Sequence, residues 1–305
     1  MPGWTTADMP SQQGRIVVIT GGTEGLGFED ALALSRAGAE VIIASRNAGK
    51  GASAVSELQA RVSGARVRFE QLDLASLESV AAFSKRLASQ LPRIDVLINN
   101  AGIMTPPERR TTSDGFELQF GLNFLGHYAL TAQLMPLLRA GKNPRVVTLS
   151  SVANRNGTIR FDDLQWERIY EPMPAYAQSK LADLLFAREF QLRSVAERWD
   201  IMSVAAHPGV SRTNLLLNGP GQNSPQAWTR RLFGRVLFQP SERGALPTLF
   251  AATAPDAEAG GYYGPNRLQE TRGNVAPARV PEAATDAKVA SRLWSTAEQL
   301  TGISF

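Results

Sequence analysis

The chain has 305 residues, of which 43% are hydrophobic and 20% charged, a composition typical of a globular protein that buries its own core. It has no cysteine and only two histidines, which excludes disulfides and thiolate zinc sites, and we predict no metal site. The net charge of +4 is small for this length, so we expect no nucleic-acid partner. No segment reaches the ~18 apolar residues of a membrane span, and the first residues form no signal peptide, so we expect a cytoplasmic protein.

Short runs rich in valine and isoleucine recur along the chain between longer helical patterns. Continuous apolar strands separated by helices indicate a parallel sheet with helices on both faces. With right-handed crossovers, this order predicts an α/β, doubly wound sheet of the Rossmann type. We expect one domain over residues 14–305, preceded by a loose tail over residues 1–13. The expected strands lie at residues 15–20, 41–45, 67–69, 94–98, 146–150 and 201–206.

A glycine-rich loop directly follows the first expected strand and precedes a helix that starts near Phe28. Glycine allows a tight turn and a close approach to a pyrophosphate, whose charge then faces the helix N-terminus. The spacing Gly-x₃-Gly-x-Gly meets the general dinucleotide fingerprint only loosely, and a plain turn is the alternative interpretation. We predict that this loop binds a dinucleotide through Gly21, Thr23, Gly25, Leu26 and Gly27.

The end of the second expected strand indicates which dinucleotide is bound. An acidic residue there holds the ribose 2′-hydroxyl of NAD, whereas a 2′-phosphate requires a cation. This strand ends Ala44-Ser45-Arg46, and a guanidinium can make a forked contact with phosphate. We therefore predict NADP(H) rather than NAD(H), with a solvated surface role for Arg46 as the alternative. Glu24, in the glycine loop, either approaches the phosphate or pairs with Arg46.

Tyr176 and Lys180 stand four residues apart at the start of a helix that follows Pro172 and Pro174. This spacing places the two side chains on one face of the helix. An ammonium ~5 Å from a phenol, at an effective dielectric constant of ~20, favours the phenolate by about 3 kcal/mol. Such a phenol can act as a general acid or base at neutral pH.

A long helix is expected after Thr112, with Phe116, Phe120, Phe124 and His127 on one stripe. The second histidine, His207, is expected to end the sixth strand. We therefore interpret His127 as a packed or capping residue, although a functional role is the alternative.

Several motifs occur in a fixed order across almost the whole chain, which thereby resembles the short-chain dehydrogenase/reductase superfamily. These are the glycine loop, Asn99-Asn100-Ala101-Gly102, Ser150-Ser151, Tyr176-x₃-Lys180 and Pro208-Gly209. The chain is more closely similar to the retinol-dehydrogenase-like and light-dependent protochlorophyllide-reductase-like branch. The segments that carry this likeness are residues 4–8, 44–47, 123–127 and 207–209.

The resemblance implies a role for each matching position. Tyr176 would exchange a proton with the substrate oxygen, Lys180 would assist it and bind the nicotinamide ribose, and Ser151 would hold the substrate oxygen. Asn123 would hold a water molecule that connects Lys180 to solvent. Further cofactor contacts would come from Asp73 and Leu74 at the adenine, from Asn100, Ala101 and Gly102 along the cleft, and from Pro208, Gly209 and Thr213 at the nicotinamide end.

Structural roles are the alternatives at three of these positions. Ser151 could cap the end of a strand, and the neighbouring Ser150 could be mistaken for it. Asn99 and Asn100 could satisfy buried backbone groups. Ser151 precedes Tyr176 by 25 residues, wider than is usual in the superfamily, and a similar extension occurs in the retinol-dehydrogenase-like branch.

A substrate lid is expected around residues 211–240, where apolar side chains alternate with Arg230, Arg231 and Arg235. A helix on a membrane surface is the alternative interpretation of this segment. We expect an NADP(H)-dependent oxidoreductase that transfers hydride between nicotinamide and a small apolar carbonyl or alcohol substrate. A non-catalytic NADP(H)-binding sensor or scaffold is the main alternative, and reduction of a ring double bond is another. The resemblance also leads us to expect a homodimer or homotetramer.

Overall fold

The computed structural model describes residues 3–210 and 239–305, and its centre is an eight-stranded sheet in the order β3-β2-β1-β4-β5-β6-β7-β8. Neighbouring strands from β3 to β7 pair in parallel, and β8 pairs antiparallel with β7. The predicted doubly wound α/β fold is confirmed. The strands are β1 (Ile16–Thr20), β2 (Glu40–Ser45), β3 (Arg66–Gln71), β4 (Val96–Asn99), β5 (Arg145–Leu149), β6 (Met202–Ala206), β7 (Tyr262–Arg267) and β8 (Arg272–Pro277).

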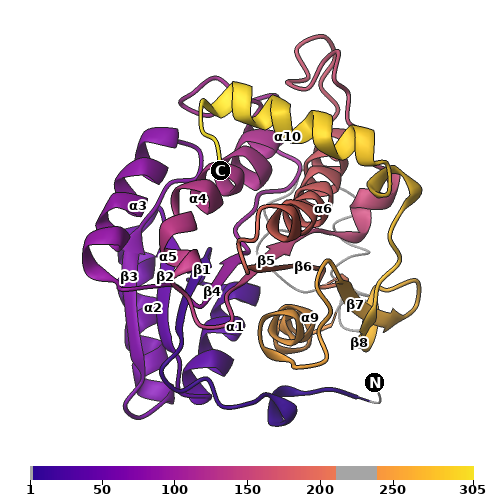
Figure 1. The fold of residues 1–305 in the computed structure, drawn as a ribbon. Coiled ribbons are helices and arrows are strands. Elements are labelled where there is room, and N and C mark those ends of the chain that lie inside the picture. The colour runs from indigo at the N-terminus through magenta and orange to yellow at the C-terminus, as the bar shows by residue number, and fades with distance from the viewer. Residues whose placement is uncertain (1–2, 211–238) are drawn as a thin grey trace.

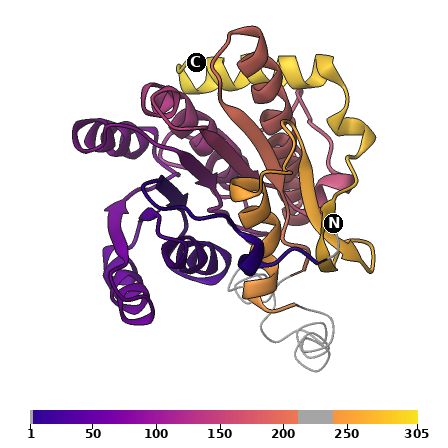
Figure 2. The ribbon, with the colours of Figure 1, turned by 60° about the horizontal axis from the view of Figure 1, so that its bottom comes forward.

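Helices cover both faces of this sheet (Figures 1 and 2). The α-helices are α1 (Gly25–Arg36), α2 (Ala48–Arg61), α3 (Leu77–Gln90), α4 (Gly126–Gln133), α5 (Met135–Arg139), α6 (Pro172–Ala196), α9 (Ser241–Thr253) and α10 (Ala287–Thr301). One core lies between the sheet and helices α1, α2 and α9, and the other lies on the opposite face, under α3, α4, α6 and α10. Short 3₁₀ helices occupy Thr6–Asp8, Val152–Asn156 and Glu282–Ala284.

The strand order reverses direction between β1 and β4. The chain passes from β1 outward to β2 and β3, then returns to place β4 on the other side of β1. In open α/β sheets, ligands bind in the crevice at the carboxyl ends of the strands where the order reverses. The loops that follow β1 and β4 meet at this point, so the fold positions a site between them.

Strands β7 and β8 have no counterpart among the six strands that the sequence predicts. Their sequences contain Gly264, Pro265, Gly273 and Pro277, residue types that are depleted in strands. The hairpin tolerates them because it forms the edge of the sheet and contains an irregularity in register between Pro265 and Arg267. Local sequence preference therefore gives little indication of these two strands.

The long helix predicted after Thr112 contains a turn of a different kind. Residues Phe120–Leu125 form a π-helix, which leads directly into α4. Phe120 and Phe124 are buried in the core on one side of the sheet, as their spacing predicts. A π-turn often marks a functional site, and this one contains Asn123.

The segment that precedes β1 packs against the domain over its described residues. The Trp4 ring meets Phe250 of α9 edge to face, with 5.4 Å between the ring centroids. The amide of Gln12 donates a hydrogen bond to the carbonyl of Ala37, at the end of α1. No helix in the described ranges 3–210 and 239–305 is long and apolar enough to cross a membrane.

Candidate cofactor and catalytic site

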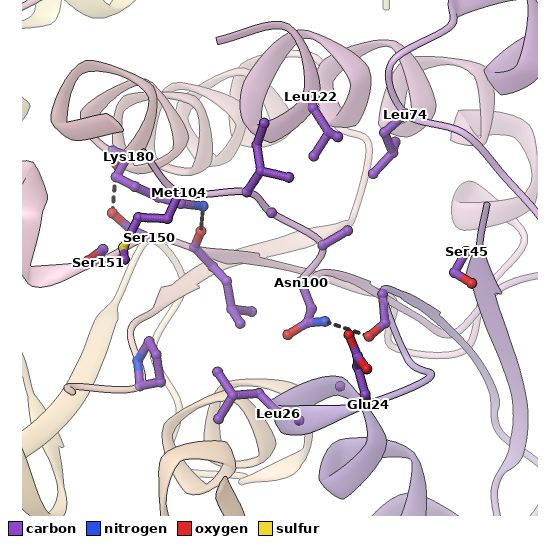
Figure 3. Close-up of a pocket in the computed structure, with 18 of the residues that line it drawn as sticks. Glu24, Leu26, Ser45, Leu74, Asn100, Met104, Leu122, Ser150, Ser151 and Lys180 are labelled. Carbon is purple, nitrogen blue, oxygen red and sulfur yellow. Dashed lines mark hydrogen bonds between the residues drawn. The ribbon is translucent and has the colours of Figure 1, made fainter. Parts of the chain in front are cut away.

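A cleft of about 640 Å³ lies at the carboxyl ends of the central strands. Figure 3 shows Ser45 and Leu74 toward one end of this cleft and Ser150, Ser151 and Lys180 toward the other. Asn100 lies between these two groups (Figure 3). The cleft therefore extends along the sheet edge from the end of β2 to the start of the segment after β5.

The structure brings nearly all the predicted site residues together. Asn123 lies behind the cleft wall, and Thr213 lies outside the described residues, as does nearly all of the expected lid. The predicted residues that line the cleft are Gly21, Thr23, Gly25, Leu26, Gly27, Arg46, Asp73, Leu74, Asn100, Ala101, Gly102, Ser151, Tyr176, Lys180, Pro208 and Gly209.

The glycine loop turns tightly between β1 and α1 because Gly21 and Gly25 adopt left-handed backbone angles, with φ of 69° and 61°. A Cβ at Gly27 would lie 2.5 Å from Asn100 Nδ2 and 2.6 Å from the carbonyl of Gly21, so only glycine fits there. Glu24 precedes α1 without making a side-chain hydrogen bond to the first turn. The N-terminal amides of α1 thus meet the cleft as a cradle that fits a pyrophosphate.

The loop after β4 is held against the glycine loop by Thr20. Its Oγ1 accepts hydrogen bonds from the amides of Asn100 and Ala101, each at 2.9 Å. Asn100 Nδ2 donates to the carbonyl of Thr20 at 2.7 Å. Asn100 therefore satisfies a buried backbone group, which is the structural role predicted as an alternative for it, and it also lines the cleft.

Side chains at the end of β2 form the opposite end of the cleft. Arg46 is exposed and borders the cleft together with Ser45 and Asn47. Glu24 forms an ion pair with Lys50, with 3.1 Å between Oε2 and Nζ. The negative charge of Glu24, which could disfavour a 2′-phosphate, is therefore paired with the positive charge of Lys50, a residue that the sequence did not indicate. Asn47 caps α2, which places Lys50 in its first turn.

The two serines after β5 have different environments. Ser150 Oγ donates to the carbonyl of Lys180 at 2.6 Å and accepts from Asn154 Nδ2, so its hydroxyl serves the fold. Ser151 Oγ accepts from the amide of Ala153 at 3.2 Å and caps the 3₁₀ helix Val152–Asn156. Among the described residues, the Ser151 hydroxyl hydrogen has no acceptor. Of the two, Ser151 is the serine whose hydroxyl can donate into the cleft.

Tyr176 and Lys180 lie in the first turns of α6 and line the cleft. Lys180 Nζ donates to the carbonyl of Leu149 at 2.9 Å and to Asp183 Oδ2 at 2.7 Å. Burial favours the neutral amine, but the carboxylate of Asp183 and the phenol of Tyr176 outweigh it and hold the pKa of Lys180 above its ordinary value. The site therefore contains a fixed positive charge next to a phenol.

Asn123 supports the cleft wall from behind. Its Oδ1 accepts from the amide of Ile103 at 2.9 Å, and its Nδ2 donates to Ser179 Oγ, also at 2.9 Å. Its backbone carbonyl lies 2.7 Å from His127 Nδ1, and His127 Nε2 lies 2.9 Å from Thr20 Oγ1. Burial lowers the pKa of His127 to about 3, so the imidazole is neutral and links the π-helix to the glycine loop. This agrees with the interpretation of His127 as a packed residue.

Several further lining residues are apolar, and the sequence did not indicate them because single apolar residues in loops carry no distinctive pattern. Met104 lies beside Ser150 and Lys180 in Figure 3. Met173 lines the cleft although half of its surface is exposed. Val152 and Val210 also belong to this apolar lining.

Comparisons with known proteins agree with this architecture. The sequence model of the short chain dehydrogenase family matches residues 15–220. Retinol dehydrogenase 13 of Mus musculus is 38% identical over 297 residues, which cover 95% of this chain and 85% of that protein. Polyprenol dehydrogenase of Mus musculus is 38% identical over 303 residues, which cover 96% of this chain and 86% of that protein.

Two solved structures give the same picture. An uncharacterised protein from Mycobacterium paratuberculosis is 40% identical and superposes with a TM-score of 0.82 over 99% of each chain. The RhlG/NADP active-site complex of Pseudomonas aeruginosa is 26% identical and superposes with a TM-score of 0.65, covering 83% of this chain and 94% of that one.

Proposed function

Because the chain belongs to the short-chain dehydrogenase family, within its retinol-dehydrogenase-like branch, we propose that this oxidoreductase uses NADP(H) and an apolar carbonyl or alcohol substrate. The observation that carries the proposal is the cluster of Ser151, Tyr176 and Lys180 at one end of a cleft whose other end is the glycine-loop cradle. A nicotinamide cofactor, when bound, would supply or accept the hydride. The chain's own residues then have to orient the substrate and move one proton.

The proton step falls to Tyr176. In the reducing direction, its phenol donates a proton to the carbonyl oxygen of the substrate, and in the oxidising direction its phenolate accepts the proton of the alcohol. Ser151 donates a hydrogen bond to the same oxygen and holds it within reach. The Lys180 ammonium, anchored on Leu149 and Asp183, stabilises the phenolate electrostatically. Asn123 keeps the loop at Ile103 and helix α6 in register behind these groups.

Two observations support NADP(H) over NAD(H), and a third supports an apolar substrate. Arg46 directly follows β2, at the position where an acidic residue would favour NAD. The solved relative from Pseudomonas aeruginosa is named as an NADP complex. Met104, Val152, Met173 and Val210 give the catalytic end of the cleft an apolar surface.

We also propose that the chain forms a homodimer or homotetramer, but not through the outer face of α6, because another part of the chain packs there. Helix α10 packs along α6, and Trp294 lies 4.5 Å from Phe305 between ring centroids. Both rings contact Tyr128 of α4, at 5.3 and 5.2 Å. The chain's own C-terminal segment thus covers the long helices (Figure 1).

The test is NADPH consumption with a panel of apolar aldehydes and ketones, with NADH in parallel. Replacing Tyr176 by Phe should lower turnover by about 10²- to 10⁴-fold, the usual contribution of a general acid or base, and leave NADPH binding unchanged. Tyr128→Phe is the matched control, because its buried hydroxyl has no hydrogen-bond partner among the described residues and lies outside the cleft. Tight NADPH binding without turnover of any substrate would favour a sensor or scaffold instead.

A further inference from the structure

Glu270 occupies the turn between β7 and β8, where it meets side chains from two other segments. Its Oε2 lies 3.0 Å from His207 Nε2, at the end of β6, and 2.5 Å from a guanidinium nitrogen of Arg155, in the 3₁₀ helix that follows Ser151. Its Oε1 accepts from the amide of Arg279 at 3.0 Å. Neither Glu270 nor Arg155 belongs to a sequence motif that predicts a function.

The protonation states make these contacts directional. His207 Nδ1 accepts a hydrogen bond from the amide of Gly209, so the ring proton resides on Nε2 and is donated to Glu270. Burial lowers the pKa of His207, which keeps the imidazole neutral. Burial alone would raise the pKa of Glu270, but its hydrogen bonds and the charge of Arg155 hold it below the ordinary value. An ionised carboxylate therefore joins a neutral imidazole to a guanidinium.

The turn that carries Glu270 has an unfavourable backbone. Leu268, Gln269 and Glu270 all adopt left-handed angles, with φ of 47°, 55° and 65°. This conformation costs about 1–2 kcal/mol per residue that is not glycine, and it persists only where surrounding contacts impose it. Arg155 Nη1 supplies one such contact by donating to the carbonyl of Gln269 at 3.1 Å. The charged side chains of the cluster thus help to hold the turn in a conformation that hairpin turns favour but that residues other than glycine adopt only at a cost.

The same hairpin contacts the wall of the cleft directly. The amide of Val210 donates to the carbonyl of Thr271 at 2.8 Å. His207 packs over Gly264 of β7, where any Cβ would overlap the imidazole ring. Pro208, Gly209 and Val210 line the cleft, and so do residues 151–153. The hairpin thus joins two segments that border the catalytic end.

We propose that Glu270 is a positioning residue that, through His207 and Arg155, clamps the β7–β8 turn onto the loop Pro208–Val210 and fixes the subsite for the nicotinamide half of the cofactor. The inference rests on the proposed function, because it assigns the cofactor's redox end to this part of the cleft. Neither Glu270 nor Arg155 lines the cleft. Their effect on the cofactor acts through the loop.

The experiment compares two ligands that differ only in the nicotinamide half. Affinities for NADPH and for ADP-ribose 2′-phosphate, which lacks the nicotinamide, are measured by calorimetry on the full chain. The variants are Glu270→Gln, Arg155→Gln and the double variant, with Glu282→Gln as a control that removes an exposed carboxylate outside the cluster. If Glu270→Gln does not fold, Arg155→Gln still tests the clamp, because it leaves the bond between His207 and Glu270 in place.

We expect Glu270→Gln to weaken NADPH binding tenfold or more and to change the affinity for ADP-ribose 2′-phosphate by less than twofold. Arg155→Gln should show the same selectivity with a smaller loss, and the double variant should be no weaker than Glu270→Gln alone. Equal losses for both ligands, or no loss for either, would overturn the inference while leaving the proposed function intact. A wild-type chain that binds neither ligand would overturn the proposed function, and the inference with it.

Discussion

Near Ser45 and Arg46 the cleft is bordered by backbone and by side chains that reach solvent, whereas Lys180, toward the other end, is buried in a hydrogen-bonded network. We refer to these as the outer end and the inner end. At the outer end, the side chains of Lys50 and Glu24 are 56% and 45% exposed. At the inner end, those of Lys180 and Asp183 are 6% and 2% exposed.

This difference separates two kinds of consequence. An exposed pair is screened by solvent and contributes little to the fold, so substitutions at the outer end should act mainly on ligand affinity. A buried pair cannot lose one partner without leaving an uncompensated charge, so substitutions at the inner end should alter stability together with chemistry. The following predictions test that division, starting with the largest expected effect.

Removing the carboxylate behind Lys180 should have the largest effect on the fold. In Asp183→Ala the Lys180 ammonium stays buried with only the Leu149 carbonyl as a partner, and we expect the free energy of unfolding to fall by about 3–5 kcal/mol. Urea denaturation at pH 7.5 measures this loss. Asp183→Asn should lose less, because its amide oxygen still accepts from Nζ. A loss below 1 kcal/mol in the alanine variant would show that the buried pair at the inner end does not govern stability.

The buried His127 predicts how the stability of the fold depends on pH. The pKa of His127 is about 3 in the folded chain against about 6.5 when unfolded, so the unfolded state binds the extra proton below pH 6.5. Stability from His127 is complete above pH 6.5 and is lost as the pH falls, by about 2 kcal/mol at pH 5. In His127→Gln this part of the acid sensitivity should disappear from urea titrations at pH 7 and pH 5.

Proton NMR provides an independent check of the same prediction. The chain has only two histidines, and burial lowers the pKa of both. The signal of His127 should not titrate between pH 8 and 6 in the folded protein, and that of His207 should titrate with a midpoint below the one it shows in urea. A histidine that titrates in the folded protein near its ordinary pKa would show that the inner network is open to solvent.

Important features of both ends of the cleft could be predicted from the sequence. The glycine loop and the Tyr176 and Lys180 pair are local patterns, in which chemistry follows from residue types a few positions apart. Their arrangement around the cleft follows from the order of strands and helices, which apolar runs indicate well. The fold and most lining residues were therefore accessible from the sequence.

The side chains that pair with residues of the site could not be predicted from the sequence in the same way. Lys50 meets Glu24 across 26 positions, and Glu270 meets His207 across 63. Such pairs depend on tertiary packing, and an isolated glutamate or lysine has no distinctive local pattern. The π-helix around Asn123 also adds a residue to one turn, which apolar spacing does not predict. Asp183 is local to Lys180, but a carboxylate three residues along a helix ordinarily faces solvent.

At the outer end, Arg46→Ala should change cofactor preference without a comparable effect on stability. One charge-assisted contact to a 2′-phosphate at an exposed position contributes about tenfold in affinity. We expect NADPH binding to weaken by that factor and NADH binding to stay within twofold, measured by calorimetry. The urea midpoint serves as the control and should not move. Equal losses for the two cofactors would show that Arg46 does not contact the 2′-phosphate.

The smallest expected effect concerns Glu24 and Lys50. Their ion pair is exposed on both sides, so Glu24→Gln should change the free energy of unfolding by less than about 1 kcal/mol. The same change removes a negative charge near Arg46 and should strengthen NADPH binding by about twofold at low salt, an effect that 0.5 M salt should largely suppress because screening shortens the reach of exposed charges. Lys50→Gln should weaken NADPH binding under the same conditions. If either variant instead destabilised the fold as much as Asp183→Ala, exposure would not be what distinguishes the two ends.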